Sequence, residues 1–361
     1  MGHRAAARRT RAAAAGGGDR DRRLVPAAHR RADRARPLTE ADALAVAASF
    51  GIDVAGASAV ALEGGYSNET VQIDARAGRF VVRRYGRLHV TRAAVAFEHA
   101  VAAHAAARMP EIMAPLRDDD GRTIHIAPGG GMSAVFPFAE GTTGRNDLAT
   151  GRAAARVLAR FHRALRDLHV ASGMRTTRFL GTLPWLRERF ARFAADPLVA
   201  RALDWSALIV TTSAAAVHVA ARTAELPHVV VHGDPNPGNV VSAAPGDVRA
   251  LIDLDFAHET ERVYDLGAFL DEFAREHEDA PLDLARIAPL LEAYAEEAPL
   301  SPAERDVIPE AMVRRAATLV WYVVTRHGER VPGDVGGAPR YAARAAEIGA
   351  NARAIREAAR G

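Results

Sequence analysis

Three polar side chains in the second half of the chain have the types and spacing of a phosphoryl-transfer site. Asp234 and Asn239 lie in the segment HGDPNPGN, and Asp253 follows fourteen positions after Asn239. Apolar, strand-like runs precede both groups, so a loop between two strands could bring them together. In kinases an Asp accepts the hydroxyl proton, an Asn five positions later holds one Mg²⁺, and an Asp on the next hairpin holds another. The spacing therefore predicts transfer of the ATP γ-phosphate to a hydroxyl.

The metal roles follow from ligand chemistry. Mg²⁺ prefers hard oxygen ligands, takes one or two from the protein, and draws others from substrate phosphates. Asn239 and Asp253 fit that role, which leaves Asp234 to act as the base. The alternative is a pair of ordinary turns, because Asp, Asn, Pro and Gly gather in turns for local reasons. That alternative does not explain why two apolar strands deliver all three groups together.

The segment HGDPNPGNVV, followed by LIDLDFAHETERVYDLG, resembles the aminoglycoside phosphotransferase family. That family includes choline, homoserine and methylthioribose kinases and shares the protein-kinase-like fold. The resemblance implies Asp234 as catalytic base, Asn239 and Asp253 as metal ligands, and His232 as a residue that orders the loop. Weaker matches extend it over residues 62–273, more than half of the chain.

The hairpin predicted over residues 62–73 is a candidate phosphate-binding element. It reads as strand, tight turn and strand, and a Gly pair followed by Ser and Asn lets backbone N–H groups approach an anion. In the family the equivalent hairpin covers the nucleotide phosphates, so Gly65, Ser67 and Asn68 are candidate ATP contacts. A plain turn is the alternative.

A strand predicted over residues 79–85 resembles the family's third strand, which usually carries a Lys that contacts the α and β phosphates. This chain contains no Lys, and all 47 of its Lys-plus-Arg residues are Arg. We assign the contact to Arg83 and expect Glu98, on the helix predicted from residue 95 to 108, to orient its guanidinium. Arg is bulkier than Lys and bidentate. This departure leaves open a nucleotide-binding regulatory protein with weak catalysis.

Phe138 ends a strand predicted over residues 133–138. The next three residues resemble the hinge that meets adenine through backbone groups, which makes Phe138 a candidate nucleotide contact. His99 is expected at the surface or boundary of its helix, whereas His162 and Trp185 are expected to pack. Asp265 resembles a structural Asp that caps the next helix and braces the catalytic loop.

The acceptor is not specified by the sequence. Asp255 is expected on the same strand face as Asp253, in support of the metal. Acidic residues near the acceptor side would suit a cationic acceptor, such as an amino alcohol or aminoglycoside, and a solvated helix face is the alternative. These acidic residues are Glu259, Glu261, Asp271 and Glu272. Homoserine, a sugar, or a protein hydroxyl, as in the stress-response kinases of the family, remain open acceptors.

The resemblance implies an α+β, bilobal, protein-kinase-like fold, and the chain is long enough to form it. At 361 residues, with 49% hydrophobic and 25% charged residues, the chain can form two lobes around sizeable cores. Residues 1–36 hold 11 Arg and 3 Asp, a net charge of +8, which leaves −5 of the total +3 for the remainder. We expect residues 1–36 to be a disordered basic tail, residues 37–141 an N-lobe and residues 142–361 a C-lobe.

The partners and compartment are inferred from what the sequence lacks. Without Cys it has no disulfides, thiolate metal sites or Cys nucleophile, which fits a reducing compartment. The most apolar stretch, residues 207–221, is interrupted by polar residues and is expected to be a buried helix rather than a membrane span. The tail could contact nucleic acid, but a solvated extension is favoured. We expect a cytoplasmic monomer or homodimer that binds a small molecule, with no membrane or nucleic-acid partner.

Overall fold

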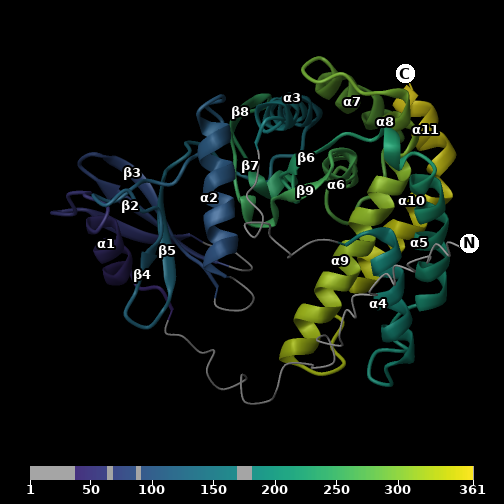
Figure 1. The fold of residues 1–361 in the computed structure, drawn as a ribbon, viewed down its shortest axis with the longest axis horizontal. Coiled ribbons are helices and arrows are strands. Elements are labelled where there is room, and N and C mark those ends of the chain that lie inside the picture. The colour runs from purple at the N-terminus through teal and green to yellow at the C-terminus, as the bar shows by residue number, and fades with distance from the viewer. Residues whose placement is uncertain (1–36, 63–67, 87–90, 169–180, 361) are drawn as a thin grey trace, which may run out of the picture. The chain divides into compact units, whose positions relative to one another are not determined.

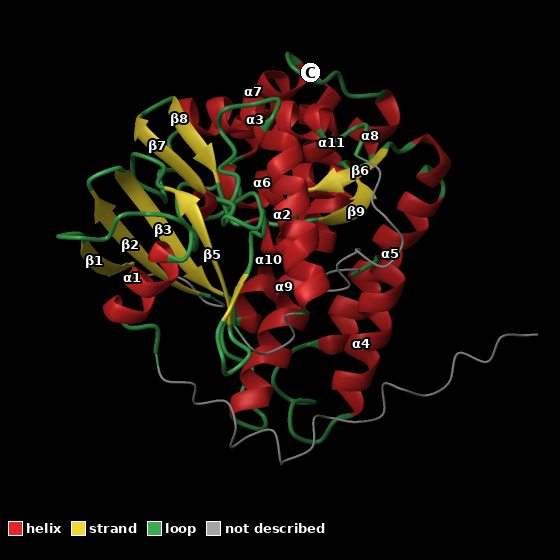
Figure 2. Cartoon of the chain, turned by 60° about the vertical axis from the view of Figure 1, so that its left-hand side comes forward, coloured by secondary structure: helices red, strands yellow, loops and turns green. Residues whose placement is uncertain are grey.

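The computed structural model describes residues 37–62, 68–86, 91–168 and 181–360. In this part an antiparallel sheet comes first and helices dominate the remainder, so the α+β class is confirmed (Figures 1 and 2). The expected tail, and the candidate residues Gly65 and Ser67, lie outside the described residues. The lobe boundary expected after residue 141 stays a prediction.

Five antiparallel strands form the N-terminal sheet, in the order β1-β2-β3-β5-β4. They are β1 (Ser58–Leu62), β2 (Glu69–Ala75), β3 (Gly78–Arg84), β4 (His125–Ile126) and β5 (Met132–Pro137). Strand β3 is central, and its register places Arg83 opposite Thr70 of β2 and Ala134 of β5. Pairing on both sides fixes the backbone that carries this cation.

Two helices accompany the sheet. α1 (Glu40–Ala48) begins at a capping box between Thr39 and Asp42, and it packs on the sheet core. α2 (Arg92–Ala106) has Val95 in a cluster with sheet residues, while its Phe97 belongs to the large core of the C-terminal part. α2 therefore joins two cores and holds Glu98 between them.

The C-terminal part is built mainly from helices around one large core. These are α3 (Leu148–Ala164), α4 (Leu183–Ala195), α5 (Trp205–Ala220), α6 (Val263–Phe273), α7 (Ile287–Ala295), α8 (Pro302–Asp306), α9 (Ile308–Arg330), α10 (Ala338–Ala350) and α11 (Ala352–Arg360). α9 packs against both α6 and α10 (Figure 1). None of the helices in the described ranges is both long and apolar enough to cross a bilayer.

The helix expected over residues 207–221 is present, but the expectation that it is buried is wrong. α5 forms there, but Val210 is 68% exposed and Val217 is 74% exposed. Only the face with residues such as Leu208 and Ala215 packs against its neighbours. The helix carries apolar residues on all of its faces, so their spacing in the sequence did not reveal which face packs against the protein.

Two small sheets support the loops of the candidate site. β6 (His228–Val231) pairs with β9 (His258–Glu261), and β7 (Val240–Ala244) pairs with β8 (Asp247–Leu251). The first loop follows β6 and ends in the short 3-10 helix η3 (Pro237–Asn239). The second follows β8 and contains the 3-10 helix η4 (Leu254–Phe256).

Candidate active site

The loop after β6 is anchored by a buried carboxylate. Asp265, in the first turn of α6, accepts hydrogen bonds from the backbone N–H groups of His232 (2.7 Å) and Gly233 (2.8 Å). Its Oδ2 also lies 2.8 Å from His162 Nε2. Burial acts to raise the pKa of Asp265, but these donors outweigh it and hold the pKa below its ordinary value. Asp265 contacts the loop as expected, but it makes no capping bond to α6.

His232 joins this loop to the one after β8. Its Nε2 lies 2.9 Å from the Ile252 carbonyl oxygen, and its Nδ1 lies 3.3 Å from the backbone nitrogen of Asp234. The ring must donate to the carbonyl and accept from the N–H, which defines a neutral Nε2–H form. Burial lowers the pKa of His232, in agreement with that neutral form. These contacts suit a residue that orders the loop.

The loops cross too closely for any residue but glycine at position 233. Gly233 has φ +87°, and a Cβ there would lie 2.2 Å from the Phe256 carbonyl oxygen. Both the conformation and the space exclude a side chain. The contact fixes the loop of Asp234 against η4.

Asn239 is held close to Asp234. Its Nδ2 donates to the Asp234 main-chain oxygen (2.9 Å) and lies 3.3 Å from Asp234 Oδ2. The main-chain carbonyl oxygen of Asn239 accepts a hydrogen bond from the backbone N–H of Ile252 at 2.9 Å, which links Asn239 to the segment that carries Asp253. Because Nδ2 is the donor in these bonds, the side-chain Oδ1 of Asn239 is the atom oriented to serve as a ligand.

Asp253 faces the guanidinium of Arg83. Arg83 Nη1 lies 3.1 Å from Glu98 Oε1, 3.3 Å from Asp253 Oδ1 and 3.4 Å from Asp255 Oδ1. Burial opposes the charge of Arg83, but the three carboxylates outweigh it and raise its pKa. Burial raises the pKa of Asp253 to about 6. The positive charge of Arg83 opposes this rise, and the negative charges of Asp255 and Asp234 add to it. Burial likewise raises the pKa of Glu98 well above its ordinary value, although Arg83 opposes this rise.

Asp255 is not on a strand, which corrects the expectation that it shares a strand face with Asp253. β8 ends at Leu251, and Asp255 lies within η4, directly after the left-handed backbone of Asp253 (φ 68°). Asp255 instead accepts a hydrogen bond from Asn68 Nδ2 at 2.6 Å. Asn68 thus links the end of the β-hairpin to the metal side of the site.

Three further residues considered in the sequence, Phe138, His99 and Trp185, pack against other side chains in the structure. Phe138 lies under the guanidinium of Arg79, 5.0 Å from its ring centroid. His99 is buried, which contradicts its expected surface position, because it bridges the Tyr85 hydroxyl (2.9 Å) and Thr123 Oγ1 (2.7 Å). Trp185 packs edge-on against Trp321, with ring centroids 4.8 Å apart.

The expected acidic acceptor surface is largely neutralised by arginines. Asp271 is buried and contacts Arg275 and Arg344, and Glu272 lies 3.1 Å from Arg344 Nη1. Glu261 lies 3.0 Å from Arg314. The arginines that pair with these acidic residues lie far from most of them in the sequence, so the acidic residues alone did not predict the neutral charge balance.

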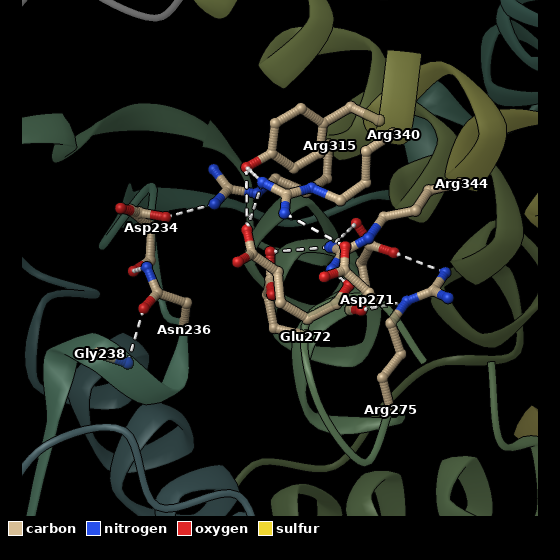
Figure 3. A network of polar contacts seen from close by, with 12 residues as sticks. Asp234, Asn236, Gly238, Asp271, Glu272, Arg275, Arg315, Arg340 and Arg344 are labelled. Atoms are coloured by element: carbon tan, nitrogen blue, oxygen red, sulfur yellow. Dashed lines mark hydrogen bonds and ion pairs between the residues drawn. The ribbon is translucent and has the colours of Figure 1, made fainter. Parts of the chain in front are cut away.

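One functional candidate was missed. Arg315, on α9, forms an ion pair through Nη2 with Asp234 Oδ1 and is 4% exposed (Figure 3). It is 81 residues away from Asp234 in the chain, so no local spacing could reveal it.

The oxygen atoms of this site fit a divalent cation whose other ligands come from a nucleotide. Among the described residues, no group of three or more His, Cys, Asp or Glu side chains could hold a metal ion alone. Asn239 and Asp253 offer two hard oxygens, one from an amide and one from a carboxylate. Mg²⁺ typically takes one or two protein ligands and fills its remaining positions with phosphate and water oxygens.

A sequence profile of the Phosphotransferase enzyme family matches residues 58–300. The match covers more than half of the chain and contains every residue of the site except Arg315. The chain therefore belongs to the phosphotransferase enzyme family.

Two homoserine kinases are similar in sequence. The chain is 34% identical over 98 residues to that of Caulobacter sp. (strain K31), which covers 27% of this chain and only 30% of that kinase. It is 27% identical over 258 residues to that of Rhodopseudomonas palustris (strain TIE-1), covering 71% of this chain and 74% of that kinase.

Solved structures of small-molecule kinases share the fold. A microcompartment-associated aminopropanol kinase has a TM-score of 0.63 at 16% identity, covering 85% of this chain and 95% of its own. The amicoumacin kinase hAmiN, in complex with AMP-PNP, Ca²⁺ and Ami, has a TM-score of 0.60 at 14% identity, covering 83% and 88%. At these identities the similarity concerns the fold alone, and the kinase-like fold expected from the sequence is confirmed.

Proposed function

We propose that the protein is a phosphotransferase that moves the γ-phosphate of ATP to a hydroxyl of a small molecule. The observation that carries the proposal is the convergence of Asp234, Asn239 and Asp253, through hydrogen bonds within the first loop and between the two loops. Membership of the phosphotransferase family supports the reaction class. The AMP-PNP and Ca²⁺ bound to hAmiN support a nucleotide and a divalent cation at this site.

Each residue has a role in the proposed reaction. Asp234 accepts the proton of the acceptor hydroxyl and orients its oxygen towards the γ-phosphorus. Asn239 and Asp253 would hold Mg²⁺, which when bound would neutralise charge on the phosphates. Arg83, held by Glu98, would steady the phosphates in the place of the usual Lys.

The nucleotide would lie against the N-terminal sheet. Asn68, which directly precedes β2, donates a hydrogen bond to Asp255, two residues after the proposed metal ligand Asp253. Gly65 and Ser67 remain proposed phosphate contacts outside the described residues, and Phe138 a proposed adenine contact. His232 would act through Asp234, by ordering the loop that carries it.

The proposed acceptor is an amino alcohol, aminoglycoside, homoserine or sugar. The homoserine and aminopropanol kinases among the similar proteins support a small amino-bearing alcohol. We further propose a cytoplasmic monomer or homodimer without a nucleic-acid or membrane partner. The Cys-free composition supports a reducing compartment, and the acidic balance of residues 37–361 argues against a nucleic-acid partner.

The test is a transfer assay with γ-labelled ATP and Mg²⁺ over amino alcohols, aminoglycosides, homoserine, sugars and a generic protein. We expect transfer to at least one small molecule, and Asp234→Ala should lower turnover at least about 10²-fold while nucleotide binding is retained. Labelling of the generic protein alone would instead identify a protein kinase. Nucleotide binding without any transfer would identify a regulatory protein and reject the proposal.

A further inference from the structure

Arg315 is a buried cation that reaches the proposed catalytic base from a distant helix. It lies on α9, and its Nη2 pairs with Asp234 Oδ1. The other carboxylate oxygen, Oδ2, lies 3.3 Å from Asn239 Nδ2. The two oxygens of Asp234 therefore have separate partners, one from the loop and one from α9. Two fixed donors define the plane of a carboxylate, which a single donor would leave free to rotate.

Arg315 is itself held by charges from a second helix. The carboxylate of Glu272, on α6, attracts the guanidinium of Arg315 electrostatically. Glu272 pairs with Arg344 of α10, and Arg344 also contacts Asp271 (Figure 3). Alternating charges thus run from Asp234 through α9 and α6 to α10.

This chain of charges continues to Glu347. Arg275 Nη2 lies 3.2 Å from Asp271 Oδ1, and its Nη1 lies 2.7 Å from Glu347 Oε2. Burial opposes the charge of Arg315, but Asp234, Tyr264 and Glu272 outweigh it and raise its pKa, so Arg315 remains a cation. A buried guanidinium that stays charged can fix a carboxylate with little loss of side-chain entropy on each turnover.

We infer that Arg315 is a positioning residue that fixes Asp234 Oδ1, so that Oδ2 is the atom presented to the acceptor hydroxyl. This inference rests on the proposed function. In the step, the hydroxyl proton moves to Asp234 Oδ2 and the acceptor oxygen bonds to the γ-phosphorus. The bond from the γ-phosphorus to the β–γ bridging oxygen breaks, and ADP leaves with that electron pair.

Arg314, the preceding residue, is a matched control. It is also buried and ion-paired, but it contacts Glu261 (3.0 Å) and the Gly181 carbonyl oxygen (2.8 Å) instead of the catalytic loop. Removing either guanidinium breaks one buried ion pair on α9. Only the loss of Arg315 should release the base.

The experiment measures kcat and the KM for ATP of the full chain, with Mg²⁺ and the acceptor that is phosphorylated fastest in the transfer assay. Arg315→Met should lower kcat at least about tenfold with KM within about twofold, because geometry at the base is lost while nucleotide binding is kept. Arg315→Lys should recover part of that loss, because it retains charge without the planar fork. Arg314→Met should retain kcat within about twofold, and urea denaturation compares the stability of all three variants.

Several results would overturn the inference. These are an unchanged or increased kcat in Arg315→Met, an equal fall in kcat in Arg314→Met, or a rise in KM alone. If Arg315→Met does not fold, Arg315→Lys decides: an approximately threefold or larger fall in kcat supports the inference, and wild-type kcat overturns it. A wild-type protein that transfers phosphate to no acceptor would reject the proposed function, and the inference with it. A wild-type protein that is active beside a fully active Arg315→Met would reject the inference alone.

Discussion

Replacing Asp265 with Asn tests whether this carboxylate holds the catalytic loop. Asp265 accepts from three N–H donors: Oδ1 from Gly233, and Oδ2 from His232 and His162. An amide has one accepting oxygen, so in the better of its two orientations the N–H of Gly233 faces a donor. An unpaired buried donor costs about 2 kcal/mol, and loss of charge weakens each of the two remaining bonds by about 1 kcal/mol. Asp265→Asn should therefore lower the unfolding free energy by about 4 kcal/mol.

The measurement pairs urea denaturation with kcat, and Glu304→Gln is the control. Glu304 is 1% exposed and also accepts from three donors, two on Arg262 and the N–H of Ser301, but it has no contact with the catalytic loop. Both variants should lose similar stability, whereas only Asp265→Asn should lower kcat, by at least about tenfold. Equal kcat values in the two folded variants would refute the reasoning.

Two further predictions concern the scaffold. Gly267→Ala should lower the unfolding free energy by at least about 2 kcal/mol, because its Cβ would lie 2.3 Å from the Ala311 carbonyl carbon where α6 meets α9. Gly328→Ala is the control, because a Cβ there would have no atom within 4 Å and should not destabilise the protein. Equal urea midpoints for the two variants would contradict the close approach at Gly267. Burial lowers the pKa of His99 to about 4, so its neutral ring contributes stability that is complete above its unfolded pKa of about 6.5 and is lost as the pH falls towards 4. His99→Gln should therefore remove about 2 kcal/mol of the fall in unfolding free energy between pH 7 and pH 5, and an unchanged pH dependence would contradict this assignment.

The catalytic loop could be predicted because its chemistry is local in sequence. Asp234 and Asn239 are five positions apart, and apolar strands precede both this loop and Asp253. The pair of Arg83 and Glu98 could be predicted because the strand and helix that carry them resemble those of the family, and the two side chains lie 3.1 Å apart. Spacing along a strand or helix translates directly into position in these cases.

Contacts between distant segments could not be predicted in the same way. Arg315 contacts Asp234 across 81 positions, and Asn68 contacts Asp255 across 187. The burial of His99 depends on Thr123, beyond its own helix, and the neutralisation of Asp271 depends on α10. The position of Asp255 was mispredicted because the left-handed backbone of Asp253 ends the strand alternation that the sequence suggested.

Binding of Mn²⁺ in the presence of AMP-PNP, followed by electron paramagnetic resonance, tests the central claim most directly. Asn239→Ala and Asp253→Ala should each weaken binding at least about tenfold, because each removes a ligand. Asp234→Ala should bind Mn²⁺ within about twofold of wild type, because Asp234 acts on the acceptor. Wild-type affinity in Asp253→Ala, or loss of Mn²⁺ in Asp234→Ala alone, would contradict the assignment of base and metal ligands.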